Sequence, residues 1–131
     1  WRRFVADDDN FTNAERVIHA DISLDHLLVA DGAIIGLIDF GDLAIGDPDY
    51  ELCYLHNDAG PEFVAAVQRV CGAELTDRLA AKLRFFELND LVFDALWALD
   101  EADHDLLAAT LTRLTSLIRL TTRAHLLLPE C

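Results

Sequence analysis

The sequence predicts an α+β protein that is mostly helical, with a small β-hairpin region in its first part and a bundle of helices in the rest. Before Tyr50 the chain is rich in Ile, Val, Leu, Gly and Asp. Asp31-Gly32 stands there between two apolar runs, a strong hairpin signal because both turn positions need a positive φ. After Tyr50, long apolar segments follow helix-capping residues. Helices gathered at one end of a small sheet form an α+β arrangement.

Three short runs of β-forming residues are expected to be strands. They are Arg16–His19, His26–Ala30 and Ala33–Phe40, and the Asp31-Gly32 turn joins the last two. The acidic residues 7–10 that precede them predict a solvated loop.

The first helices are expected directly after the strand region. Pro48–Asn57 predicts a short helix, with Asp47 as its N-cap and the proline at the first helical position. Pro61–Val70 predicts the next helix, which Gly72 closes.

Two long helices are expected to complete the chain. Thr76 can cap one that reaches about Leu99, and Asp103 can cap another that runs to about His125. These long helices are apolar on nearly every face, which predicts that they form the core. The apolar residues that indicate this are Leu83, Phe85, Phe86, Leu88, Leu91, Val92, Phe93, Leu96 and Trp97 of the first one.

The composition excludes several classes of function. The 131 residues carry 24 acidic and 10 basic side chains, for a net charge of -14. This balance argues against binding to nucleic acid or to anionic membrane surfaces, and it favours cationic ligands. No apolar run approaches the roughly 20 residues that span a bilayer. One ordinary domain fits the length.

The cysteine pattern predicts a cytoplasmic protein, and the N-terminus predicts that the chain is a segment of a longer one. Cys53, Cys71 and Cys131 are an odd number at wide spacing without a CxxC pair, which predicts reduced thiols. The chain starts at Trp1, contains no Met and shows no signal peptide. We therefore expect it to be the middle and end of something longer.

Four residues that can move protons or bind metals lie at strand ends or in the loops between them. They are His19, Asp21, His26 and Asp39, and such loops are where catalytic groups concentrate. Asp39 stands between two large apolar residues, where a carboxylate is rarely tolerated unless it is paired or binds a metal. The simpler alternatives are hydrogen-bonded turn carboxylates for the two aspartates and a packed hairpin histidine for His26.

Three ordered motifs resemble the catalytic core of the aminoglycoside phosphotransferase family, whose members are relatives of the protein kinases. They are HADISLDH at residues 19–26, IDFG at residues 38–41 and GDPDYEL at residues 46–52. In protein kinases the first two correspond to HxDxxxxN and DFG, and the third is similar to a GDPxxDL segment of the family. The resemblance is greatest to the 2''-phosphotransferase branch, which carries His where other kinases carry Asn.

This resemblance implies that residues 1–131 form the C-terminal lobe of a protein-kinase-like fold, without the N-terminal nucleotide lobe. The six glycines form no GxGxxG loop, and the only lysine, Lys82, lies in a predicted helix. The implied reaction transfers the γ-phosphoryl group of ATP or GTP to a hydroxyl of an aminoglycoside or similar molecule, as in antibiotic resistance. The isolated lobe is expected to be inactive.

The resemblance also assigns roles to single residues. Asp21 matches the catalytic-loop aspartate that accepts the proton of the attacking hydroxyl. Asp39 matches the Mg²⁺-binding aspartate, and His26 takes the place of the metal-binding Asn. His19 and Asp47 are expected to support the catalytic loop.

Further acidic residues are candidates for binding a cationic substrate. Asp58 lies in a region where relatives place the acids that bind substrate. For Asp42 two interpretations stand: a plain turn residue, or a contact for a cationic substrate. Asp94 shares a helix face with Glu87 and Asp90, and we favour the solvated side of the helix over a substrate cleft for this face.

Two other functions remain open. One is a non-catalytic, truncated kinase lobe that self-associates through the apolar surface left by the missing lobe, near Ile22, Leu43 and Ile45. The other, less favoured, is a hydrolase that holds a transition metal with the His and Asp residues of the first two motifs.

Overall fold

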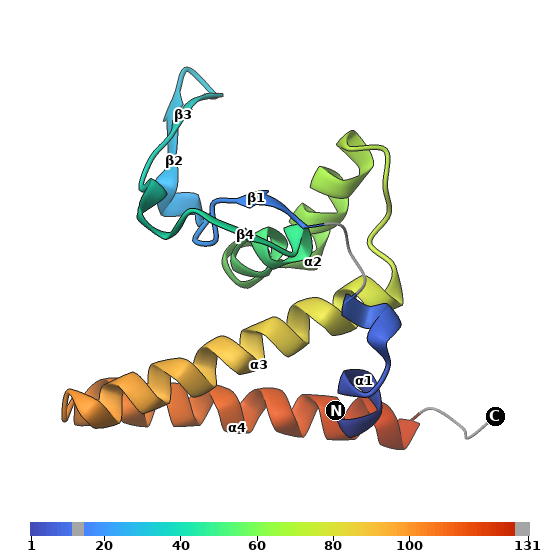
Figure 1. The fold of residues 1–131 in the computed structure, drawn as a ribbon, viewed down its shortest axis with the longest axis vertical. Helices are drawn as coiled ribbons and strands as arrows, with labels where there is room; N and C mark the ends of the chain where they lie inside the picture. Colours follow the sequence, from blue (N-terminus) through green and yellow to red (C-terminus); the bar gives the residue numbers. More distant parts are fainter. Residues whose placement is uncertain (12–14, 128–131) are drawn as a thin grey trace. The chain divides into compact units, whose positions relative to one another are not determined.

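The computed structural model describes residues 1–11 and 15–127, and the chain divides into two compact units. The first unit is residues 1–87 and the second begins at residue 88, inside the helix α3 (Asp77–Asp100). All described strands and all three motifs belong to the first unit (Figure 1). Within the described residues, no helix combines the length and the apolar character that a membrane span requires.

Two antiparallel strand pairs form the first part of this unit. β2 (Leu27–Ala30) and β3 (Ala33–Leu37) make the predicted hairpin, with positive φ angles of 52° and 74° at its Asp31-Gly32 turn. β1 (Arg16–Ile18) pairs with β4 (Ala44–Gly46), a strand that the sequence pattern does not predict. Three residues are too few to show an alternating pattern.

The predicted strands are too long by one to three residues, and short 3-10 turns contain the excess residues His26 and Phe40. His19 follows β1, His26 ends a turn over Leu24–His26, and Phe40 begins a turn over Phe40–Asp42. Between β3 and the 3-10 turn over Phe40–Asp42, Asp39 adopts a left-handed φ of 64°. This conformation ends the extended path of the strand.

The acidic opening is only partly the predicted solvated loop. After α1 (Arg2–Val5), a 3-10 turn covers Asp8–Phe11, and Asn10 within it is buried. The side-chain amide of Asn10 donates to the carbonyl of Phe4 at 2.8 Å, and the Phe4 ring packs against Phe85 of α3. Asn10 and the rings therefore anchor this segment, while its aspartates are exposed.

The two predicted short helices form one element with a break. A 3-10 turn over Pro48–Tyr50 leads into α2 (Glu51–Val70). At Gly60 the backbone leaves helical geometry, with φ 82° and ψ 175°. Pro61 follows this break. A proline has no N–H to donate, so it interrupts the preceding helical segment and is well suited to the first position of the next one.

The two long helices begin at the predicted caps. Thr76 accepts a hydrogen bond from the Leu79 N–H at 3.1 Å at the start of α3, and Asp103 accepts one from Leu106 at 2.9 Å at the start of α4 (His104–Leu127). Both helices end within two residues of the expected positions.

The core of the first unit lies between α2 and α3. Its buried residues are Leu52, Leu55, Val64 and Leu83, and Ile22, Val67, Leu75 and Leu79 pack against them. The prediction that α3 is buried on nearly every face is wrong beyond residue 88. Leu91, Ala95 and Ala98 are buried there, whereas Phe93 and Trp97 are 61% and 56% exposed. Residues three or four apart share one helix face, so a helix with one neighbour leaves its other faces open.

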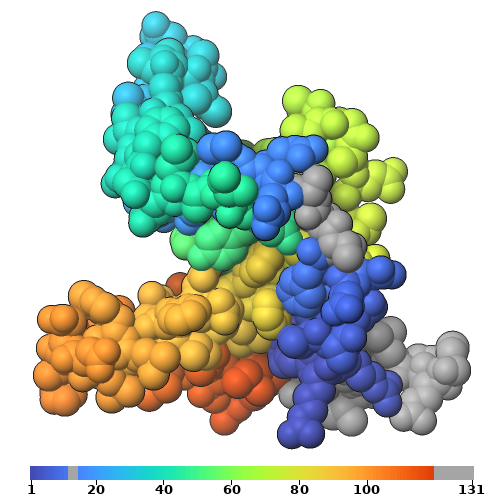
Figure 2. All heavy atoms as spheres, in the orientation of Figure 1, coloured from blue at the N-terminus to red at the C-terminus, as the bar shows by residue number. Residues whose placement is uncertain are grey.

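The strands leave apolar side chains open to solvent. Val17 and Ile45 lie opposite each other in the β1–β4 register and are 69% and 73% exposed. In the hairpin, Val29, Ile34 and Ile35 are also exposed. Figure 2 shows the β2–β3 hairpin uncovered on the face in view.

Candidate active site

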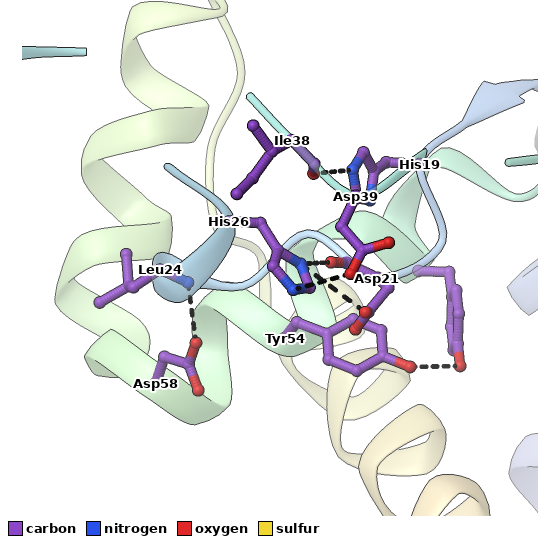
Figure 3. A network of polar contacts seen from close by, with 9 residues as sticks. His19, Asp21, Leu24, His26, Ile38, Asp39, Tyr54 and Asp58 are labelled. Carbon is purple, nitrogen blue, oxygen red and sulfur yellow. Dashed lines mark hydrogen bonds and ion pairs between the residues drawn. The ribbon is translucent and has the colours of Figure 1, made fainter. Parts of the chain in front are cut away.

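The polar residues of the first two motifs meet where β1 and β3 end (Figure 3). Asp21 lies in the loop after β1, directly after Ala20, whose φ of 66° is left-handed. His26 ends the 3-10 turn before β2, and Asp39 follows β3. Two strand ends and one tight turn thus bring together residues that are up to 18 positions apart, Asp21 and Asp39.

The His26 imidazole lies between the two aspartates. Its Nδ1 donates to the backbone carbonyl of Asp21 at 2.7 Å and lies 3.6 Å from Oδ2 of the same residue. Its Nε2 lies 3.7 Å from Oδ2 of Asp39. The Asp21 and Asp39 side chains are 34% and 63% exposed. Both carboxylates therefore remain open to a ligand while the histidine ties their backbone segments together.

The surroundings raise the pKa of His26 above its ordinary value of 6.5. The hydrogen bond to the Asp21 carbonyl is the largest cause, because it favours the protonated ring. Partial burial opposes it, and the negative charges of Asp21, Asp39 and Asp25 raise the pKa further.

Asp39 and His26 also present donor atoms that suit a divalent metal. Since Nδ1 of His26 donates a proton, the neutral ring carries its lone pair on Nε2, the atom that faces Asp39. Mg²⁺ prefers oxygen ligands and is commonly held by one or two carboxylates together with substrate phosphates. The donor set fits such an ion, with Asp39 as the stronger ligand and His26 as the weaker one. Among the described residues, no cluster of three or more His, Cys, Asp or Glu is arranged to hold a metal.

His19 is buried behind this pair and contacts both motifs. Its Nε2 donates to the carbonyl of Ile38 at 2.9 Å, one residue before Asp39. Its ring packs against Phe40 at a centroid distance of 4.9 Å and against His26 at 5.9 Å. The backbone N–H of His19 donates to the carboxylate of Glu51, in the first turn of α2.

Asp47 starts the segment that leads into α2. Its Oδ1 accepts a hydrogen bond from the Asp49 N–H at 3.0 Å, and its Oδ2 forms an ion pair with Lys82 of α3. Lys82 also binds Asp49, at 2.9 Å. Asp47 is thus a capping residue, as the sequence predicts, and Lys82 is a contact that the sequence pattern misses.

Comparisons with known proteins identify the family of the chain. A sequence profile of the phosphotransferase enzyme family matches residues 1–86, which include all three motifs. The chain belongs to the phosphotransferase enzyme family.

The individual proteins that the chain resembles are aminoglycoside phosphotransferases. The aminoglycoside 3'-phosphotransferase of Escherichia coli is 37% identical over 79 residues, which are 59% of this chain and 29% of that protein. The GDP and kanamycin complex of APH(2'')-IIIa is 31% identical with a TM-score of 0.84, over 90% of this chain and 41% of that one. The GDP complex of aminoglycoside 2'-phosphotransferase-IIIa is 32% identical with a TM-score of 0.79, over 88% and 40%.

These comparisons confirm the resemblance to aminoglycoside phosphotransferases, including the 2''-branch, and the partial kinase-like fold. The chain spans less than half the length of the relatives that it matches. The site therefore belongs to a family of phosphotransferases.

The predicted substrate acids have different surroundings. Asp58 accepts a hydrogen bond from the Leu24 N–H at 3.0 Å, so it joins α2 to the turn that carries His26 (Figure 3). Asp42 is exposed at the end of the 3-10 turn after Asp39. Asp94 is exposed on α3 in the second compact unit.

Two residues of the site have only a weak signal in the sequence. Lys82 is a single lysine within an apolar helical stretch, and such a lysine is rarely buried unless it is paired. Glu51 stands where the family segment GDPxxDL carries an aspartate, and its role depends on a backbone contact to His19, 32 residues away.

The raised pKa of His26 predicts a pH-dependent contribution to stability. Because the folded-state pKa is above the unfolded-state pKa, the protonated ring stabilises the folded chain. This stabilisation is complete below the unfolded-state pKa and is lost as the pH rises through the folded-state pKa. A ¹H–¹³C NMR titration should place the His26 midpoint above 6.5.

The Asp39→Asn variant should lower that midpoint because it removes one of the negative charges beside the ring. The matched control is Asp31→Asn, in the hairpin turn, which should leave the midpoint unchanged. An unshifted midpoint in the unmodified chain, or an equal effect of both variants, would contradict the geometry of the cluster.

Proposed function

We propose that the chain is the catalytic and substrate-binding part of a phosphotransferase that transfers the γ-phosphoryl group of ATP or GTP to a hydroxyl of an aminoglycoside or a similar cationic molecule. The observation that carries the proposal is the open pair of carboxylates on either side of His26, in a chain of the phosphotransferase family. Family membership favours this reaction over the metal-dependent hydrolase.

Asp21 is the residue that receives the substrate proton in this proposal. The substrate hydroxyl oxygen bonds to the γ-phosphorus, and the bond from that phosphorus to the β–γ bridging oxygen breaks. The hydroxyl proton passes to Asp21, and ADP or GDP leaves. Because the transition state of phosphoryl transfer is loose, aiming the hydroxyl matters more than the basicity of the carboxylate. The hydrogen bonds around the Asp21 loop supply that aim.

Asp39 and His26 hold Mg²⁺ in this proposal. When bound, the ion neutralises charge on the β- and γ-phosphates. His19 keeps Asp39 in place through the Ile38 carbonyl, and Asp47 holds the start of α2. These roles give five polar residues of the three motifs a task in orienting either the nucleotide or the substrate hydroxyl.

Carboxylates beside the site provide the attraction for a cationic substrate. The net charge of -14 favours such a ligand, and one similar structure is a kanamycin complex. Asp42 is the exposed acid nearest in sequence to Asp39. Asp58 orders the Asp21–His26 loop with one oxygen, Oδ2, and Oδ1 can meet an ammonium group.

The complete activity needs more than this chain. Because the chain spans 41% of APH(2'')-IIIa, we expect the 131 residues alone to show negligible turnover. The three widely spaced cysteines predict reduced thiols, so we expect the complete enzyme to work in the cytoplasm. The remaining part of such an enzyme would cover the nucleotide.

Fusion to the part of APH(2'')-IIIa that the chain does not match should give a protein that phosphorylates kanamycin with GTP or ATP. Asp21→Asn in this fusion should lower kcat by about 10²- to 10⁴-fold, the usual contribution of a general base. The matched control is Asp25→Asn, an exposed carboxylate of the same loop, which should retain kcat within a few-fold. A folded fusion without phosphorylated product, or equal losses in both variants, would contradict the proposal.

The exposed apolar strands favour a second candidate function, a binding module that self-associates. Val17 and Ile45 form an open apolar pair on β1 and β4, and Leu43 beside them is also exposed. Sedimentation of the 131-residue chain at several concentrations should then show reversible association. Ile45→Glu should weaken it, whereas Val70→Glu, at an exposed position at the end of α2, should not. A strict monomer at all concentrations would exclude this function.

A further inference from the structure

Lys82 is a buried cation that the three motifs do not include. It is the only lysine of the chain and it is 3% exposed. Its Nζ forms ion pairs with Asp47 and, at 2.9 Å, with Asp49. A buried charge is strongly unfavourable unless it is paired. The cation and the two carboxylates therefore depend on one another for their positions.

The two aspartates define where α2 begins. Asp47 directly follows β4, and its Oδ1 accepts from the Asp49 N–H while its carbonyl accepts from Tyr50 at 3.0 Å. The Oδ2 atoms of both aspartates bind Lys82. The turn from β4 into α2 is thus closed by its own hydrogen bonds on one side and fastened to α3 by Lys82 on the other.

Glu51, the first residue of α2, connects this turn to the catalytic loop. Glu51 accepts a hydrogen bond from the backbone N–H of His19 with Oε1, and its Oε2 is buried without a hydrogen-bond partner among the described residues. The position of this carboxylate therefore depends on where α2 starts. The strands that lead into the two segments, β1 and β4, are paired as well, with Arg16 opposite Gly46.

The last step leads from His19 to the candidate metal ligand. The His19 ring donates to the carbonyl of Ile38, the residue before Asp39. A continuous series of polar contacts and short backbone segments therefore runs from Lys82 through the Asp47–Glu51 turn and His19 to Asp39. Within the described residues, Lys82 pairs with Asp47 and Asp49 and not with Asp21, His26 or Asp39.

We propose that Lys82 is a positioning residue of the site: it fixes the start of α2, and through Glu51 and His19 it holds the catalytic loop and the IDFG segment in register. The proposal rests on the function proposed above for its consequence in phosphoryl transfer. The positioning itself is a property of the folded chain and can be measured without any transfer reaction.

The test compares Lys82→Met with the matched control Arg84→Met, which removes a cation from an exposed position on the same helix. The amide hydrogen exchange of His19 is measured by NMR, with the Leu83 amide in the buried core as the reference for global opening. In Lys82→Met we expect His19 to exchange at least about tenfold faster relative to Leu83, because the Glu51 contact opens locally. The His19 amide proton should also move upfield as its hydrogen bond to a carboxylate weakens.

A purely stabilising role of Lys82 would increase the exchange of His19 and Leu83 by the same factor and leave the His19 amide shift unchanged, and this result would overturn the proposal. Arg84→Met should change neither quantity. If Lys82→Met does not fold, Asp49→Asn removes one of the two ion pairs and should give a smaller change in the same direction. Because kinase activity is not measured, failure here is distinct from failure of the proposed phosphotransferase function.

Discussion

The hydrogen bond from the His26 ring to the backbone of Asp21 is the interaction on which the candidate site depends. It holds the loop after β1 against the turn before β2, and it directs the other ring nitrogen toward Asp39. The His19 ring adds a second link between the segments that carry Asp21 and Asp39, through the carbonyl of Ile38. With these links, two negative charges face one space and remain open to solvent, which is the arrangement that a phosphate-bound divalent ion and a substrate hydroxyl both require.

Four acidic side chains near the site serve local order, so only part of the negative charge there is available to a ligand. Asp47 and Asp49 bind Lys82, Glu51 accepts from the backbone of His19, and Asp58 accepts from that of Leu24. These carboxylates hold turns and helix starts together. The more exposed side chains at the site, Asp39 above all, are those left to meet a cation.

The sequence is sufficient to predict the features that depend on short-range chemistry. The Asp31-Gly32 turn, the caps at Thr76 and Asp103 and the order of the three motifs are all local patterns, and the structure contains the turn and the caps. Features that depend on distant contacts are not predictable in this way. β4 exists because it pairs with β1, and Trp97 is exposed because the buried face of α3 is formed by Leu91, Ala95 and Ala98. The burial of Lys82 depends on its ion pairs with Asp49 and Asp47, which lie 33 and 35 residues earlier in the chain.

Titration of the ¹⁵N-labelled chain with kanamycin tests the central claim, that the open carboxylates beside His26 form a site for a cationic substrate. We expect saturable amide shifts at Asp21, Asp39 and Asp42 and at the Leu24 amide that Asp58 binds, and we expect them to weaken with added salt. A neutral sugar of similar size should cause none. Shifts spread evenly over the acidic residues of the chain, or their absence around His26, would contradict the claim.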